Sequence, residues 1–149
     1  QHIAPTPVEN LRPLLDFLKQ NNIKVGVCSN TIHSEEHTVD FIKQCWPDMP
    51  FDFVMASSTY GVKKPNPRFF EIGAKLAGSK NEETIYIGDN FYADVYGSWL
   101  SGFMKSIWLN QKHRSKIDYY LHHPEMSDKI EYTEIDDYLK LIPVLEKMF

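Results

Sequence analysis

The chain carries a hydroxyl and an amide side chain directly after an apolar run. Ser29, Asn30 and Thr31 follow residues 25–28, which are apolar enough to form a buried strand. A hydroxyl and successive backbone N–H groups at a strand-to-helix turn form a cradle for an anion, especially where a helix starts beside it. The same residue types are common in turns that bind nothing, so this segment by itself supports both interpretations.

A lysine stands beside a proline in the segment 61–67. Lys64 precedes Pro65, which disfavours helical backbone at the lysine, and Asn66-Pro67 is typical of a helix start. We therefore expect Lys64 at a fixed loop position, where its ammonium group suits the negative charge of a phosphate. A solvated turn lysine would leave the same pattern, so both interpretations stay open.

Two carboxylates follow a later apolar run. Gly88 and Asp89 come directly after residues 84–87, and Asp94 follows shortly afterwards. Glycine allows another group to approach the backbone closely, and a carboxylate at a sheet edge can hold a hard cation. In the alternative interpretation, Asp89 or Asn90 caps a helix, and Asp94 only interacts with the helix dipole.

These polar segments lie between apolar runs that alternate with helical patterns. Apolar runs predict strands near residues 24–29, 51–56, 84–87 and 103–109. A 3.6-residue period predicts helices near residues 8–20, 34–46, 66–77, 92–100 and 136–148, and residues 110–133 are polar and irregular. This alternation predicts an α/β fold, with a parallel sheet covered on both faces. Because reactive groups in such sheets lie past the carboxyl ends of strands, we expect the three segments at one edge.

Local residues also predict where two helices start. Residues 6–9 form a T-x-x-E capping box with Pro7 at the first helical position, but Pro13 would kink that helix or delay its start. Ser34 is expected to cap the next helix, with Glu35 in its first turn.

A zinc-protease pattern overlaps the second of these helix starts. His33, Glu36 and His37 match H-x-x-E-H. We favour the capping interpretation, because Ser34 and the acidic residues suit a helix start and no third metal ligand is evident.

Composition excludes several functional classes. The chain has 149 residues, enough for one domain, and a net charge of −4. It has no Lys/Arg cluster that would track a nucleic acid, and no apolar run long enough to span a membrane. Cys28 and Cys45 are interpreted as two buried thiols in a reducing cytoplasm rather than as a disulfide.

The three segments resemble motifs of the haloacid dehalogenase-like (HAD) hydrolase superfamily, because the hydroxyl, the lysine and the paired acids follow one another in the same order. The second motif of that family, an apolar strand that ends in Ser or Thr, resembles residues 25–30. Its third motif, a lysine before a proline at a helix start, resembles residues 64–70. Its fourth motif, Gly-Asp followed by a second Asp, is matched by Gly88, Asp89 and Asp94.

The resemblance covers about residues 8–110 and implies a single, partial HAD-like core domain over 1–149, Rossmann-like and built of three layers. It implies that Ser29 binds the phosphoryl oxygens and that Asn30 helps to orient them. It also implies that Lys64 neutralises the charge that develops during phosphoryl transfer.

The fourth motif implies a metal and a reaction class. By the resemblance, Asp89 ligates Mg²⁺ and Asp94 supports the metal shell. The Gly88-Asp89 pair favours the phosphatases of the family over its dehalogenases. The complete protein is thus expected to be a Mg²⁺-dependent phosphomonoester hydrolase that acts on a small phosphorylated metabolite.

One departure from the family pattern is large. The family nucleophile lies in a D-x-D motif on an amino-terminal strand, and these residues contain no D-x-D. In the family that strand lies between those that correspond to residues 25–29 and 84–88, so its absence should leave a gap in the sheet.

Two explanations of the departure follow, and we favour the first. In one, the chain, which opens with Gln1, is part of a longer protein that supplies the strand. In the other, the two flanking strands re-pair, and the domain is a non-catalytic binding module. We expect this chain alone to be inactive, and an unfilled strand position would favour a homodimer.

Overall fold

The computed structural model describes residues 10–148, in which strands alternate with helices. The strands are β1 (Gly26–Ser29), β2 (Phe53–Ala56), β3 (Ile85–Gly88), β4 (Lys105–Leu109) and β5 (Thr133–Ile135). The helices are α1 (Leu11–Gln20), α2 (Glu35–Cys45), α3 (Ser57–Tyr60), α4 (Pro67–Leu76), α5 (Gly97–Leu100), α6 (Ile117–His122) and α7 (Leu141–Glu146). All four predicted strands form within two residues of their expected positions. The short elements β5, α3 and α6 were not predicted.

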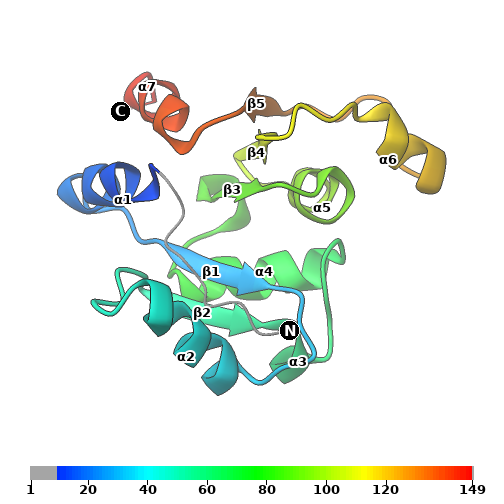
Figure 1. Cartoon of the computed structure of the whole chain (residues 1–149). Coiled ribbons are helices and arrows are strands. Elements are labelled where there is room, and N and C mark those ends of the chain that lie inside the picture. The colour runs from blue at the N-terminus through cyan, green and yellow to red at the C-terminus, as the bar shows by residue number, and fades with distance from the viewer. Residues whose placement is uncertain (1–9, 149) are drawn as a thin grey trace.

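All strand pairs are parallel, and they form two separate sheets. β1 pairs with β2, with Val27 opposite Val54. β3, β4 and β5 form the second sheet, in which Ile87 lies opposite Ile107. Figure 1 shows β1 and β3 facing each other across the division between the sheets. The parallel α/β prediction is confirmed, and within residues 10–148 β1 and β3 do not re-pair.

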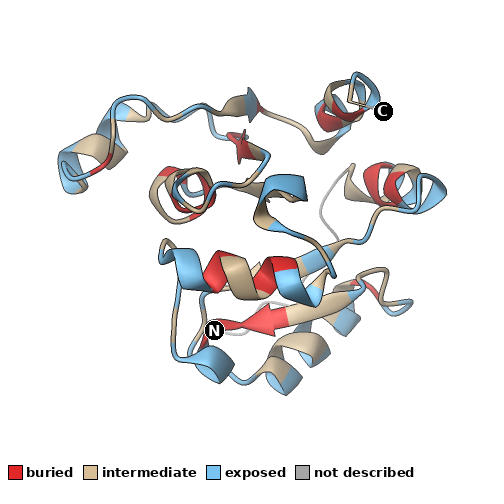
Figure 2. Cartoon of the chain, turned by 180° about the vertical axis from the view of Figure 1, so that it is seen from behind, coloured by how far each residue is buried: buried red, intermediate tan, exposed pale blue. Residues whose placement is uncertain are grey.

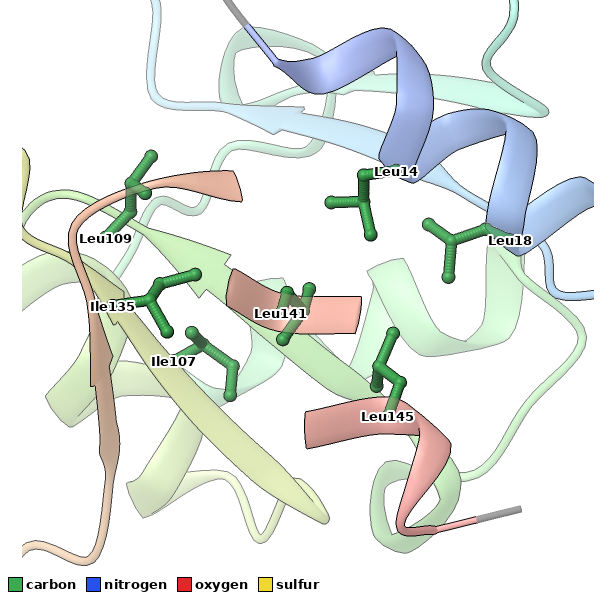
Figure 3. Close-up of a cluster of buried hydrophobic side chains, with 7 residues drawn as sticks. All are labelled: Leu14, Leu18, Ile107, Leu109, Ile135, Leu141 and Leu145. Carbon is green, nitrogen blue, oxygen red and sulfur yellow. The ribbon is translucent and has the colours of Figure 1, made fainter. Parts of the chain in front are cut away.

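Helices α1 and α7 form a layer on one face of the sheets. Leu14 and Leu18 of α1 and Leu141 and Leu145 of α7 converge on Ile107 of β4, as Figure 3 shows. Each of these side chains is at most 9% exposed. Burial of a leucine stabilises a fold by about 1.5–3 kcal/mol, so this cluster fixes both helices against the second sheet.

Helix α4 covers the opposite face. The side chains of Ile85 and Ile87 pack towards α1 and α7, whereas that of Tyr86, on the other side of the strand, lies 4.9 Å from the Phe70 ring of α4. A side chain at Gly73 of α4 would contact the Cys28 sulfur of β1 at 3.4 Å. α4 therefore packs against both sheets. Figure 2 shows buried residues along α4, whereas α2 carries none.

The predicted helix starts are confirmed where the structure describes them. The Ser34 hydroxyl accepts a hydrogen bond from the His37 N–H at the start of α2. Asn66 caps α4 in the same way, with Pro67 in its first turn. α1 begins at Leu11, so Pro13 lies in the first turn, where no backbone bond is lost. The predicted capping box at residues 6–9 lies outside the described residues.

The helix predicted over 92–100 has two parts. Residues Phe91–Tyr96 form a π-helical turn, which continues directly into α5. The Asn90 carbonyl accepts hydrogen bonds from both Asp94 N–H and Val95 N–H. π-Helical turns often mark functional positions, and this one carries Asp94.

The carboxyl-terminal third differs from the sequence interpretation. Residues 110–133 were expected to be irregular, but they contain α6 and bury Met126 against Phe91 and Trp108. The helix predicted over 136–148 is shorter than expected. Asp137 caps a 3-10 turn at Tyr138–Lys140, which leads into α7. No helix in the described part of the chain combines the length and hydrophobicity needed to cross a membrane.

Candidate active site

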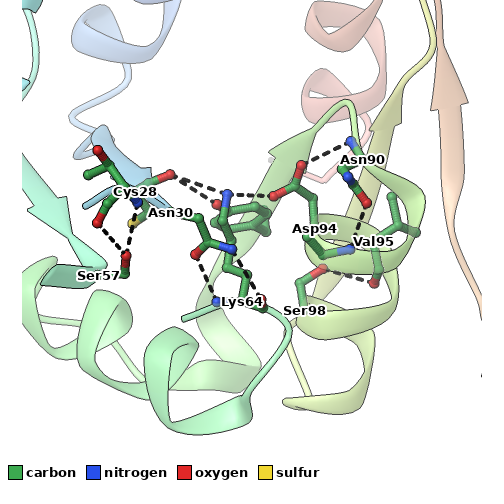
Figure 4. Close-up of polar contacts among 11 residues, drawn as sticks. Cys28, Asn30, Ser57, Lys64, Asn90, Asp94, Val95 and Ser98 are labelled. Atoms are coloured by element: carbon green, nitrogen blue, oxygen red, sulfur yellow. Dashed lines mark hydrogen bonds and ion pairs between the residues drawn. The ribbon is translucent and has the colours of Figure 1, made fainter. Parts of the chain in front are cut away.

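The ammonium group of Lys64 lies in a nearly closed polar site between the two sheets. Its Nζ is 2.7 Å from Asp94 Oδ1 and 3.4 Å from the Cys28 carbonyl oxygen. Figure 4 marks both contacts with dashed lines. The same atom lies 5.5 Å from the centre of the Tyr86 ring. The Lys64 and Asp94 side chains are only 11% and 6% exposed. The interpretation of Lys64 as a solvated turn lysine is therefore wrong.

Asn30 fixes the loop that carries Lys64. Its Oδ1 accepts a hydrogen bond from the Lys64 N–H at 2.9 Å, and its Nδ2 donates to the Lys64 carbonyl at 3.1 Å. The peptide bond between Lys64 and Pro65 is cis. Asn30 thus joins the loop after β1 to the loop before α4, and its amide contacts protein backbone in this structure.

Asp94 is held by contacts to both of its carboxylate oxygens. While Oδ1 pairs with Lys64, Oδ2 accepts a hydrogen bond from the Asn90 N–H at 3.0 Å. A Cβ at Gly88 would lie 2.2 Å from Asp94 Cγ, so the site needs glycine there. The motif glycine therefore makes room for the acid. The role of Asp94 in a metal shell stays a prediction, since in this structure the carboxylate neutralises Lys64.

Asp89 is the available carboxylate of the motif. It is exposed at the end of β3, and no hydrogen bond or ion pair of its side chain occurs within residues 10–148. Its backbone carbonyl accepts a hydrogen bond from Trp108 Nε1 at 2.9 Å, which fixes the turn. Mg²⁺ binds through one or two carboxylates, with water and substrate phosphate as its other ligands. A free carboxylate at this edge fits that requirement.

Ser29 ends β1 with its hydroxyl unpaired among the described residues. The following turn is fixed by Ser57 of α3, whose Oγ accepts from the Thr31 N–H and donates to the Thr31 carbonyl. The turn after β1 is thus held on both sides, by Ser57 and by the Asn30 contacts. The Ser29 hydroxyl stays available for a ligand.

Burial changes the acidity of two groups beside Lys64. It raises the pKa of the Cys28 thiol to about 11, an effect that Lys64 opposes and Asp94 reinforces. It also raises the pKa of the Tyr86 hydroxyl well above its usual value, and the nearby Asp94 carboxylate raises it further. Both groups therefore stay neutral near pH 7. Both cysteines are free thiols, as predicted, but Cys45 is only half-buried rather than buried.

Of the predicted site residues, direct contacts join Asn30, Lys64 and Asp94. Ser29 and Asp89 lie at the ends of β1 and β3, the same edge of the parallel strands. The sequence interpretation missed Tyr86 and Ser57. An aromatic residue just before Gly88 was a weak signal for the first, and nothing in the sequence indicated the second.

The zinc pattern is not supported by the described residues. The rings of His33 and His37 lie 4.5 Å apart, but no group of three possible metal ligands occurs within residues 10–148.

A match to a protein-family model shows which family this chain belongs to. The model described as haloacid dehalogenase-like hydrolase matches residues 1–103. The chain belongs to the haloacid dehalogenase-like hydrolases. Solved HAD structures share its fold. The HAD phosphatase of Thermococcus onnurineus aligns with a TM-score of 0.75 and 22% identity over 93% of this chain and 57% of its own. The 2-haloacid dehalogenase of Pseudomonas syringae aligns with a TM-score of 0.74 and 20% identity over 95% of this chain and 54% of its own.

Curated HAD relatives include named phosphatases. The glyceraldehyde 3-phosphate phosphatase of Pyrococcus furiosus is 35% identical over 102 residues, which are 65% of this chain and 38% of the relative. The corresponding Methanothermobacter thermautotrophicus protein is 32% identical over 71% of this chain and 46% of its own length. This chain therefore spans less than half of the length of these relatives, both of which are named as phosphatases.

Proposed function

We propose that this chain is part of a Mg²⁺-dependent phosphomonoester hydrolase. The observation that carries the proposal is the buried Lys64–Asp94 pair at the carboxyl edge of parallel strands. A lysine fixed in this way can face the negative charge of a phosphoryl group without reorganising. The free Ser29 hydroxyl and Asp89 carboxylate at the same edge support the assignment.

Each residue of this site has a proposed role. The Ser29 hydroxyl donates a hydrogen bond to a phosphoryl oxygen, and Lys64 neutralises charge that develops in the transition state. Asp94 orients Lys64, and Asn30 fixes the loop that carries it. Asp89 would hold Mg²⁺, which when bound adds positive charge beside the transferring group.

A small phosphorylated molecule is the substrate class that we propose. Relatives named glyceraldehyde 3-phosphate phosphatase support it, as does an Escherichia coli relative named pyrimidine 5′-nucleotidase, 28% identical over 74% of this chain and 48% of its own length. The net charge of −4 disfavours a nucleic-acid substrate. The free thiols of Cys28 and Cys45 favour a cytoplasmic location.

The proposed reaction also needs a nucleophile, which we place outside these 149 residues. The family resemblance implies a D-x-D motif, and the sequence has none. We therefore expect no hydrolysis by residues 1–149 alone and metal-dependent hydrolysis by the complete protein.

The test is hydrolysis of para-nitrophenyl phosphate by the complete gene product with and without Mg²⁺. Asp89→Asn should lower kcat/KM at least about a hundredfold. Asp40→Asn is the matched control, because Asp40 is exposed on α2 and its side chain makes no hydrogen bond or ion pair with the described residues. Full activity of Asp89→Asn would contradict the metal assignment. Binding of Mg²⁺ or phosphate without any turnover would instead support a non-catalytic HAD-like module.

A further inference from the structure

Four aromatic rings stack in a row beside the helix that follows Asp89. The rings of Trp99 and Tyr96 lie 6.4 Å apart between centroids, and those of Tyr96 and Tyr92 lie 5.9 Å apart. The ring of His123, which follows α6, stacks on Tyr92 at 3.5 Å with an angle of 4° between the two planes. Residues spaced by three and four positions share one face of a helix. We call these four rings the aromatic ladder.

The aromatic ladder ends at the edge of the sheet where Asp89 lies. The π-helical turn begins after Asn90, at the carboxyl end of β3, and α5 ends at Leu100, before the amino end of β4. Tyr92 is therefore the ring of this helix nearest the candidate active site, and Trp99 is the farthest from it. His123 extends the ladder beyond Tyr92, because within residues 10–148 it has no ring contact except with Tyr92.

The backbone on both sides of His123 fixes its ring beside Asp89. The His123 N–H donates a hydrogen bond to the Tyr119 carbonyl at 2.8 Å, and the His123 carbonyl accepts one at 3.1 Å from the N–H of Met126, which is buried. The Tyr119 hydroxyl donates to the Asp89 carbonyl at 3.5 Å. Figure 1 shows α6 on the side of the molecule to which the arrowheads of β1 and β3 point. His123 is thus held one helical turn from a contact with Asp89.

The outer face of the His123 ring is open to a ligand. Tyr92 covers the inner face, yet the His123 side chain is still 35% exposed. A planar ring stacks readily on such a face, and every nucleobase has one. The Glu125 carboxylate, with Oε2 at 3.5 Å from His123 Nδ1, is 55% exposed and can accept a hydrogen bond from an N–H group of that ring.

We propose that the outer face of His123 is a stacking site for the base of a nucleoside monophosphate. The phosphate of this ligand would lie at the site formed by Lys64 and Asp89, and the base would become the next ring of the aromatic ladder. The inference rests on the proposed phosphatase function for the phosphate, and it deepens that function by naming the substrate class.

The position of His123 also limits the shape of the ligand. Tyr119 contacts the backbone of Asp89, and His123 lies one turn farther along the chain. A ligand that reaches both Asp89 and the outer face of His123 therefore needs a spacer between its phosphate and its ring. The ribose of a nucleotide is such a spacer. An aryl phosphate, whose ring is bonded directly to the phosphate oxygen, has none.

The first test compares uridine 5′-monophosphate with ribose 5-phosphate, which lacks the base, as substrates of the complete gene product. The wild-type value of kcat/KM should be at least about tenfold higher for the nucleotide. His123→Ala should lower the ratio of the two values about tenfold, whereas His123→Phe, which keeps a stacking ring, should retain it. A ratio near one in the wild type, or an unchanged ratio in His123→Ala, would overturn the proposal.

His122→Ala is the matched control for His123→Ala. His122 is the adjacent residue and is exposed, and its ring Nδ1 contacts the Asp118 carbonyl of α6 at 2.8 Å. The ratio of the two kcat/KM values should stay within about twofold of the wild-type ratio in this variant. An equal fall in both variants would show that the base does not stack on His123, and would overturn the proposal. Because each ratio is taken within one protein, a smaller folded fraction of a variant does not change it.

The second test does not depend on catalysis. Uridine, which has no phosphate, and ribose are titrated separately into the complete gene product, and the ring resonances of its histidines are followed by NMR. Uridine should shift the His123 ring upfield in a saturable manner, because a stacked base shields it, and should leave the exposed ring of His113 unchanged. Ribose should shift neither ring.

The two tests separate the stacking site from the phosphatase. Hydrolysis of neither substrate would refute the proposed function, and the uridine titration would then decide the stacking site alone. Absence of a His123 shift with uridine, or equal shifts with uridine and ribose, would overturn the stacking site and would leave the phosphatase proposal intact.

Discussion

Lys64 Nζ and Asp94 Oδ1 lie 2.7 Å apart in a pair that the two sheets almost completely enclose. Such a pair is costly to desolvate, and its net contribution to stability is small compared with the cost of breaking it. It nevertheless leaves a lysine with a single orientation at the edge where a substrate phosphate would arrive. Positioning of a charge, rather than stability, is the property that this arrangement supplies.

Removal of one charge from the Lys64–Asp94 pair should destabilise the fold. Asp94→Asn leaves the Lys64 ammonium buried without a counter-charge, so the free energy of unfolding should fall by about 3 kcal/mol. Chemical denaturation measures the change. Asp48→Asn is the control, because Asp48 pairs with Arg12 at the surface, with side chains 58% and 42% exposed, and should change stability much less. Equal losses in the two variants would show that the Lys64 pair is effectively solvated.

Loss of the Asn30 amide should loosen the Lys64 loop. In Asn30→Ala the Lys64 N–H loses its acceptor, so this amide should exchange with solvent at least about tenfold faster. Asn21→Ala is the matched control, since the Asn21 side chain bonds the Phe17 carbonyl at the end of α1. An unchanged exchange rate at Lys64 in Asn30→Ala would exclude a positioning role for Asn30.

The buried thiol predicts a loss of stability at alkaline pH. Unfolded Cys28 ionises near pH 9.0, whereas burial raises the pKa of the folded thiol to about 11. The stabilisation that the neutral Cys28 thiol gives the folded state is therefore fully present below pH 9, and it is lost as the pH rises from 9 to 11. Between pH 8 and pH 10 the free energy of unfolding should fall by about 1 kcal/mol through this group.

Cysteine variants isolate that effect. Denaturation at pH 8 and pH 10 should show a smaller difference in Cys28→Ala than in the wild-type chain. Cys45→Ala should retain the wild-type difference. If the free energy of unfolding of Cys28→Ala fell between pH 8 and pH 10 as much as that of the wild type, other groups, such as tyrosines, would account for the fall.

The sequence was sufficient to predict features that depend on local pattern. Residues close together in the sequence were enough to predict the strand that ends at Ser29, the cap at Ser34 and the helix start at Asn66-Pro67. All three are present. β5 is only three residues long and lies in a polar stretch, so its pairing with β4 depends on long-range contacts that no local pattern encodes.

The geometry of the candidate site could not be predicted from the motifs. The motifs indicated Lys64 and Asp94 but not their direct pairing, because Asp94 was expected to support the shell of a bound metal. That pairing depends on the π-helical turn at Phe91–Tyr96 and on the space left by Gly88. Neither the turn geometry nor the bonds between Asn30 and Lys64 can be obtained from residue spacing.

A comparison of Lys64→Met with Lys63→Met in the complete gene product tests the central claim most directly. The two lysines are adjacent and the substitutions identical, but Lys63 is exposed, whereas Lys64 is buried beside Asp94. Hydrolysis of para-nitrophenyl phosphate should be measured at a temperature where circular dichroism shows both variants folded. We expect Lys64→Met to lose kcat by about a hundredfold or more and Lys63→Met to stay within about twofold of wild type. Equal activity of the two variants would contradict a phosphoryl-binding role for Lys64.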